Sequence, residues 1–117
     1  MYKISKQFSF SASHVLDKLC DGHPCARLHG HNYVVTVHLR SEVLDEYGFV
    51  KDYRALKPVK EFLDNELDHR HLNDVISSHP TAENIARFLF EKFKPDFPEL
   101  YAVEVSETPK TSAVYEA

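Results

Sequence analysis

Residues 29–40 read His29-Gly-His-Asn-Tyr-Val-Val-Thr-Val-His-Leu-Arg40, the clearest strand pattern in the chain. Its odd-numbered positions carry a row of apolar side chains, Tyr33, Val35, Val37 and Leu39. Thr36, His38 and Arg40 lie on the opposite face, because successive side chains of a strand point to opposite sides. The pattern therefore predicts a half-buried strand with one apolar face.

His29 and His31 belong to the same odd-numbered row. Residues i and i+2 of a strand are about 6.6 Å apart and share a side, so two imidazoles at this spacing can converge on one ion. A coincidental pair of surface histidines is the alternative. Gly30 between them would allow a close backbone approach.

A second strand is predicted over residues 2–14, where Phe8, Phe10 and Ala12 share a face with His14 and Lys6 interrupts the pattern. If this strand pairs with the first through a loop over residues 15–28, the three histidines meet at one end of the sheet. Three histidines with no fourth protein ligand are typical of a catalytic zinc, because one coordination position stays open.

The remaining elements are two helices and two strands. Asp52 is expected to cap a helix that runs to about Leu67 and that Pro58 kinks or restarts in its first turn. Thr81 is expected to cap a second helix, and strands are expected over residues 100–107 and 111–115. The two apolar stripes are Leu56, Val59, Leu63 and Leu67, and then Ile85, Leu89 and Phe93.

The order β-β-α-α-β-β predicts an α+β fold, a four-stranded antiparallel sheet with two helices on one face. The two edges of such a sheet must be covered or paired with another chain. A chain of 117 residues suits one domain, residues 1–117. Its net charge of −4 argues against general binding to nucleic acid or to a membrane surface.

The sequence shows no signal peptide and no run of apolar residues long enough to span a bilayer. It contains only two cysteines, Cys20 and Cys25. A disulfide framework is therefore not expected, and a reducing cytoplasm is the expected location.

Five segments, in this order, resemble the signature of the 6-pyruvoyl-tetrahydropterin synthase family. They are Phe8-Ser-Phe-Ser-Ala-Ser-His14, Cys25-Ala-Arg-Leu-His-Gly-His-Asn-Tyr33, Leu67-Asp-His-Arg-His-Leu-Asn73, Pro80-Thr-Ala-Glu-Asn84 and Val105-Ser-Glu-Thr108. The three-residue gap between Cys25 and the His29-Gly-His31 motif resembles the 6-carboxy-5,6,7,8-tetrahydropterin synthase branch, which acts in queuosine biosynthesis.

This resemblance implies a tunnelling fold, in which trimeric barrels stack into homohexamers with active sites shared between subunits. It implies a lyase that holds Zn²⁺ through His14, His29 and His31. The implied substrate is 7,8-dihydroneopterin triphosphate, which is converted to 6-carboxy-5,6,7,8-tetrahydropterin with loss of acetaldehyde and triphosphate. The alternatives are 6-pyruvoyl-tetrahydropterin synthesis, which keeps the side-chain carbons, and a non-catalytic zinc-binding or pterin-binding module.

The resemblance also implies a proton-transfer apparatus. Cys25 would act as the base, and Asp68-His69 would form a carboxylate–imidazole pair, which must lie outside a regular helix because adjacent residues there point apart. A small buried thiol is the alternative for Cys25, and a simple helix end is the alternative for Asp68 and His69. Cys20 has no counterpart in the family.

Substrate binding is assigned to four further residues, again by the resemblance: Glu107, Thr81, Thr108 and Arg27. A carboxylate such as Glu107 can accept from the 2-amino group and N3–H of a pterin together. A strand-end glutamate turned to solvent is the alternative. Arg27 is the leading candidate for the triphosphate, with Lys51 and Arg70 behind it. His71 and His79 are expected at the surface.

Overall fold

The computed structural model describes residues 1–16 and 23–117, and for Cys25 it describes the backbone alone. One four-stranded antiparallel sheet has the order β1-β2-β3-β4. Its strands are β1 (Tyr2–His14), β2 (His29–Ser41), β3 (Leu100–Thr108) and β4 (Thr111–Tyr115). The predicted α+β fold, with a four-stranded antiparallel sheet, is confirmed.

β1 and β2 pair along their whole length, from Tyr2 opposite Ser41 to His14 opposite His29. This register sets Phe10 opposite Tyr33, and the two rings stack with their centroids 4.9 Å apart. Even-numbered residues of β1 and odd-numbered residues of β2 therefore share the face that packs on the core. The same register carries both rows into the histidines at one end of the sheet.

The helical region that was predicted over residues 52–67 has three parts. These are a 3-10 turn η2 (Tyr53–Leu56), α1 (Lys57–Phe62) and a π turn η3 (Leu63–Leu67). The Asp52 carboxylate accepts the Arg54 N–H at 2.9 Å, which confirms Asp52 as the cap.

A single regular helix is therefore wrong in detail. Pro58 lies in the first turn of α1, where a missing N–H costs nothing, so the α-helix restarts there as predicted. The last turn widens because the Asp68 N–H donates to the Leu63 carbonyl, five residues back, at 2.8 Å. The apolar stripe is confirmed, since Leu56, Val59, Leu63 and Leu67 are all buried.

Two more helices follow. α2 (Leu72–Val75) was not predicted, since four residues are too few for a helical pattern. α3 (Ala82–Phe93) begins at Thr81, whose hydroxyl accepts the Asn84 N–H at 3.2 Å, as expected of an N-cap. Ile85, Leu89 and Phe93 point into the core, as predicted.

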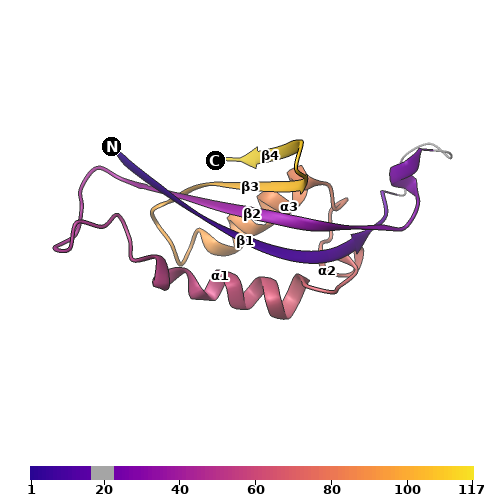
Figure 1. Ribbon diagram of the computed structural model, residues 1–117, viewed down its shortest axis with the longest axis horizontal. Coiled ribbons are helices and arrows are strands. Elements are labelled where there is room, and N and C mark those ends of the chain that lie inside the picture. Colours follow the sequence, from indigo (N-terminus) through magenta and orange to yellow (C-terminus); the bar gives the residue numbers. More distant parts are fainter. Residues whose placement is uncertain (17–22) are drawn as a thin grey trace.

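The helices form one layer against one face of the sheet, with α1 beneath the β1–β2 ribbon and α3 behind β3 (Figure 1). The core between the layers includes Tyr33, Val35, Val37 and Leu39 of β2. β1 and β4 form the two edges of the sheet. None of the helices within the described ranges has the length and apolar character that crossing a membrane requires.

Candidate metal centre and active site

Three imidazoles meet at the end of the sheet where β1 ends and β2 begins. The ring centroids of His14 and His29 are 4.4 Å apart, and those of His31 lie 5.2 Å from His14 and 4.9 Å from His29. Each residue offers one ring nitrogen, and the three nitrogens lie within 4.8 Å of one another. The sheet thus brings together the three histidines that the alternation predicted.

Backbone carbonyls determine which ring nitrogens carry protons. The Nδ1–H of His14 donates to the Pro80 carbonyl at 2.7 Å, and the Nδ1–H of His29 donates to the Arg27 carbonyl at 2.7 Å. A neutral imidazole has one N–H, so both Nε2 atoms carry lone pairs. Such hydrogen bonds fix the tautomer and ring orientation of metal-binding histidines.

The Nε2 atoms of His14 and His29 face each other at 2.8 Å. Two lone pairs at that distance repel unless a proton or a cation lies between them. His31 Nε2 is also buried and makes no hydrogen bond to any described residue. Two ligands of a tetrahedral ion, each about 2.0–2.1 Å from it, stand roughly 3.3 Å apart. The cluster therefore fits a metal ion in its donor chemistry and in its spacing.

Burial suits these ligands. His14 is fully buried, and its burial lowers the pKa of its imidazole, an effect that the nearby His29 reinforces and the Pro80 carbonyl opposes. A lowered pKa favours the neutral ring, which is the form that binds metal. Burial also raises the pKa of the neighbouring Tyr33, so its phenol stays neutral beside His14.

Asp68 and His69 form the expected pair. His69 Nδ1 lies 2.8 Å from Asp68 Oδ2, and the other carboxylate oxygen, Oδ1, accepts the Ser11 N–H at 2.8 Å. Asp68 ends the π turn in an extended conformation, and His69 has a φ of 58°, in the left-handed region. The expectation that this pair lies outside a regular helix is confirmed. The Ser11 N–H, with His69 as a second partner, holds the pKa of Asp68 below its usual range.

A pocket of about 600 Å³ joins this pair to the metal cluster. It is lined by Ser11, Ala12, Ser13, Gly30, His31, Asn32, His69, Arg70 and His71. Sequence reasoning missed Asn32 and the two serines, and it expected His71 at the surface. His71 is half-buried and bonds through Nδ1 to the Ser13 hydroxyl at 3.0 Å. The signal was present, because His69-Arg-His71 repeats the spacing of His29-Gly-His31.

Glu107 reaches the cluster from β3. Its Oε2 lies 3.6 Å from His31 Nε2, and the side chain is 23% exposed. It also lines a smaller pocket of about 220 Å³ between the start of α3 and the strands β3 and β4. The two threonines are less free than Glu107. The Thr81 hydroxyl caps α3, and that of Thr108 lies 2.9 Å from the Thr111 hydroxyl at the β3–β4 turn.

The three candidate cations are dispersed. Arg70 lines the pocket, whereas the Arg27 side chain is exposed two residues before His29. Lys51 is paired with Glu99 at 3.4 Å, near the far end of β2, where the Glu99 carbonyl accepts the Arg40 N–H. The expectation that Lys51 approaches the cluster is therefore wrong within one chain. His79 is half-buried, not fully exposed. Cys20 lies outside the described residues, and so does the side chain of Cys25.

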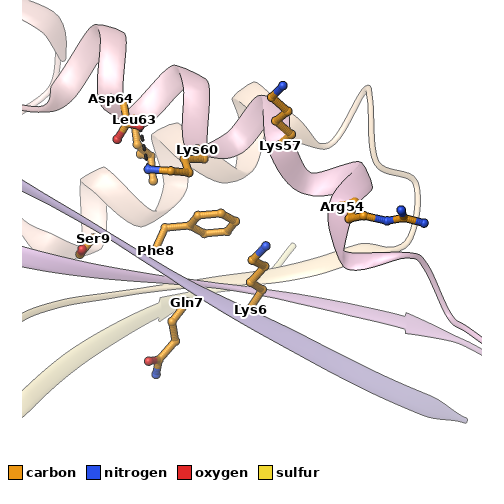
Figure 2. A pocket seen from close by; sticks show the side chains of 9 residues that line it. All are labelled: Lys6, Gln7, Phe8, Ser9, Arg54, Lys57, Lys60, Leu63 and Asp64. Carbon is orange, nitrogen blue, oxygen red and sulfur yellow. Dashed lines mark hydrogen bonds and ion pairs between the residues drawn. The ribbon is translucent and has the colours of Figure 1, made fainter.

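Another pocket, of about 460 Å³, lies between the middle of β1 and the helical region (Figure 2). The basic pocket, as we call it, is lined by Lys6, Gln7, Phe8, Ser9, Arg54, Lys57, Lys60, Leu63 and Asp64. Lys60 pairs with Asp64 at 2.8 Å and Arg54 with Asp52 at 2.7 Å, so neighbouring carboxylates already neutralise two of its cations. Figure 2 shows Arg54 and Lys57 directed away from Phe8. None of the histidines of the metal cluster lines it.

Comparison with known proteins agrees with this arrangement. Residues 3–117 match the family described as 6-pyruvoyl tetrahydropterin synthase. The chain is 39% identical to the 6-carboxy-5,6,7,8-tetrahydropterin synthase of Synechocystis sp., over 98% of this chain and 93% of that protein. It is 37% identical to a putative 6-pyruvoyl tetrahydrobiopterin synthase of Caenorhabditis elegans, over 92% of this chain and 89% of that protein.

The fold agrees as well. The solved structure of Caenorhabditis elegans 6-pyruvoyl tetrahydropterin synthase superposes with a TM-score of 0.86 at 34% identity, covering 99% of this chain and 95% of that one. The chain therefore belongs to the 6-pyruvoyl tetrahydropterin synthase family, and it is a lyase-type enzyme similar to the 6-carboxy-5,6,7,8-tetrahydropterin synthases.

Proposed function

We propose that this chain is a zinc-dependent 6-carboxy-5,6,7,8-tetrahydropterin synthase that uses His14, His29 and His31 as metal ligands. The observation that carries the proposal is the pair of inward-facing Nε2 atoms, 2.8 Å apart, beside a pocket that the Asp68–His69 pair borders. Zinc is the ion favoured by three neutral imidazoles with an open fourth position. When bound, zinc would polarise the side-chain oxygens of the substrate as a Lewis acid.

The proposed reaction converts 7,8-dihydroneopterin triphosphate into 6-carboxy-5,6,7,8-tetrahydropterin, acetaldehyde and triphosphate. The neopterin carbons divide between the two organic products, and water supplies the atoms needed to release triphosphate. No external oxidant or reductant is needed, because the oxidation of the side chain is balanced by reduction of the dihydropterin ring. Such internal redox chemistry requires protons to be moved between carbon and oxygen atoms.

We assign those proton transfers to Cys25 and to the Asp68–His69 pair. The Asp68 carboxylate holds His69 by its Nδ1–H, which stabilises the imidazolium and directs the other nitrogen toward a reacting group. Cys25 lies in the turn η1 (Pro24–Ala26), four residues before His29. A cation nearby lowers the pKa of a thiol and makes the thiolate available as a base.

We assign recognition of the pterin ring to Glu107. Its carboxylate is next to His31, so a ring bound there would place its side chain close to the metal cluster. A carboxylate accepts two hydrogen bonds from adjacent donors, as the 2-amino group and N3–H of a pterin require. Thr81 and Thr108 are secondary candidates, because their hydroxyls already take part in local hydrogen bonds.

We assign the phosphate chain to the pocket beside β1. The side chains that line this pocket include Arg70, His69 and His71, and none of them is acidic. An anion is therefore better tolerated there than in the basic pocket, where Asp64 is present. Arg27 is the second candidate, because its exposed side chain precedes the metal motif by two residues.

Assembly is part of the proposal. The edge strands β1 and β4 are suited to pairing with a second copy, which would close the sheet into a barrel. A trimer or hexamer with active sites at subunit boundaries would then complete the pockets around Glu107 and His69. The free thiol of Cys25 fits a reducing cytoplasm.

The main competing function is 6-pyruvoyl tetrahydropterin synthesis, which the Caenorhabditis elegans relatives favour by name. Product analysis separates the two reactions. Zinc-loaded protein incubated with 7,8-dihydroneopterin triphosphate should yield acetaldehyde and a pterin that has lost a two-carbon fragment, measured by mass spectrometry. A pterin that retains all side-chain carbons would show the pyruvoyl reaction instead. Zinc binding without turnover would indicate a binding module.

A further inference from the structure

Residues 68–73 run along the outer edge of the last part of β1, and we call this segment the strap. The His69 N–H donates to the Ser11 carbonyl at 2.6 Å, and the Ser13 N–H donates to the Arg70 carbonyl at 3.1 Å. Ser13 and His71 form a parallel bridge. The strap therefore continues the sheet for a few residues on the side of β1 that faces away from β2.

The strap ends in a side-chain clamp. Asn73 Oδ1 accepts the Val15 N–H at 2.9 Å, and Asn73 Nδ2 donates to the Val15 carbonyl at 2.9 Å. One amide thus binds both backbone groups of one residue, as a neighbouring strand would. Both polar ends of the Asn73 side chain are used, so an isosteric substitution cannot preserve both bonds.

The clamp acts next to a metal ligand. His14 is the last residue of β1, and Val15 follows it immediately. A ligand at a strand end has the ladder on one side only, so its backbone needs restraint on the other side. Val15 is that other side, and within residues 1–16 and 23–117 the printed restraint on its backbone is Asn73.

We propose that Asn73 is a positioning residue that holds the backbone of His14 in the orientation that binds metal. The same strap carries Asp68 and His69, so the clamp also fixes the proton-transfer pair relative to the metal ligand. Asn73 touches neither substrate nor metal, and it acts through Val15. The inference rests on the metal site that is proposed above.

The test measures zinc binding by the full-length protein. Asn73→Ala removes both bonds and should raise the zinc dissociation constant about tenfold, the lower range for loss of a residue that orients a ligand. Asn73→Asp keeps one acceptor but sets a carboxylate oxygen against the Val15 carbonyl, so it should weaken binding at least as much. The exposed Asn65→Ala is the matched control and should bind zinc as the wild type does.

Competition with a chelator gives the dissociation constants, and the visible spectrum of bound Co²⁺ reports the ligand geometry. Circular dichroism of the metal-free variants, at a temperature at which all are folded, separates lost stability from lost affinity. If Asn73→Asp does not fold, Asn73→Ala decides, because alanine suits the short helix α2.

Two outcomes overturn the inference, and they are distinguishable. His14→Ala with wild-type zinc affinity would reject the proposed metal site and the inference with it. Loss of zinc in His14→Ala, together with equal dissociation constants and equal Co²⁺ spectra for Asn73→Ala and Asn65→Ala, would reject the positioning role alone. A larger dissociation constant and an altered spectrum in Asn73→Ala would support it.

Discussion

The two halves of β1 differ in what covers their outer edge. Residues 11–15 are covered by the strap, which bonds to Ser11, Ser13 and Val15. For residues 2–10, no described segment forms a comparable bridge, and the basic pocket of Figure 2 opens beside them. The covered half carries His14 and faces His69, whereas the open half carries Lys6 and Phe8.

The difference shows that one strand can provide two kinds of surface. Both halves alternate in sequence, and both place even-numbered residues on the core face. Only the covered half combines fixed tautomers, a buried ligand and a nearby acid–base pair. The cations of the basic pocket are largely paired with carboxylates and exposed, so they resemble an ordinary solvated surface.

The largest effect is expected when the covered half loses its metal ligands. The double variant His29→Ala/His31→Ala removes two of three donors, so it should lose zinc and essentially all turnover. Elemental analysis of the purified protein measures the zinc content. Lys60→Ala in the basic pocket is the control and should leave both properties unchanged. Full zinc occupancy in the double variant would place the metal elsewhere.

The next effect concerns the proposed base. Cys25→Ala should leave zinc content and fold intact but lower turnover by about 10²–10⁴-fold, the usual contribution of a general base. Steady-state assays with saturating substrate measure this, alongside Cys20→Ala, which should be nearly silent. Equal turnover in the two variants would remove Cys25 from the mechanism.

A smaller effect is expected at the pterin ring. Glu107→Gln replaces one acceptor oxygen with a donor, and binding of a pterin without phosphates should weaken about tenfold, equivalent to about 1.4 kcal/mol. Isothermal titration calorimetry measures this, with zinc content as the check that the cluster is intact. An unchanged dissociation constant would mean that another group anchors the ring.

The smallest effect tests the link between the strap and β1. Because the Ser11 N–H and His69 lower the pKa of Asp68, the folded state binds the Asp68 proton more weakly than the unfolded state. The stability from this group is therefore present above its ordinary pKa of 3.8 and is lost as the pH falls through the lower folded value.

Denaturant unfolding should show this dependence. The free energy of unfolding of the wild type should decrease more steeply from about pH 5 to about pH 3 than that of Asp68→Asn, which has no carboxylate to protonate. Parallel curves for the two proteins would show that Asp68 does not stabilise the covered half.

Much of the covered half was predictable, because its signals are periodic. The alternation through His14 and through His29 and His31 predicted a common face, and the observed register confirms it. Thr81 was recognised as a cap from its place after Pro80. The 3-10 and π turns around α1 were not, since the spacing of apolar residues is nearly the same in all three helix types.

The strap was beyond the reach of pattern reasoning. Its contacts join residues that are more than fifty positions apart, and its six residues are too few for a periodicity. His71 was therefore assigned to the surface, and Asn73 received no role. Lys51 was misplaced for a similar reason, because only the three-dimensional arrangement puts it beside Glu99, away from the cluster.

The most direct test of the central claim is anomalous X-ray scattering at the zinc edge from crystals grown with zinc. We expect one peak per chain among His14, His29 and His31, about 2.0–2.1 Å from one ring nitrogen of each. A peak at another position, or no peak at these three imidazoles in a zinc-loaded crystal, would contradict the account.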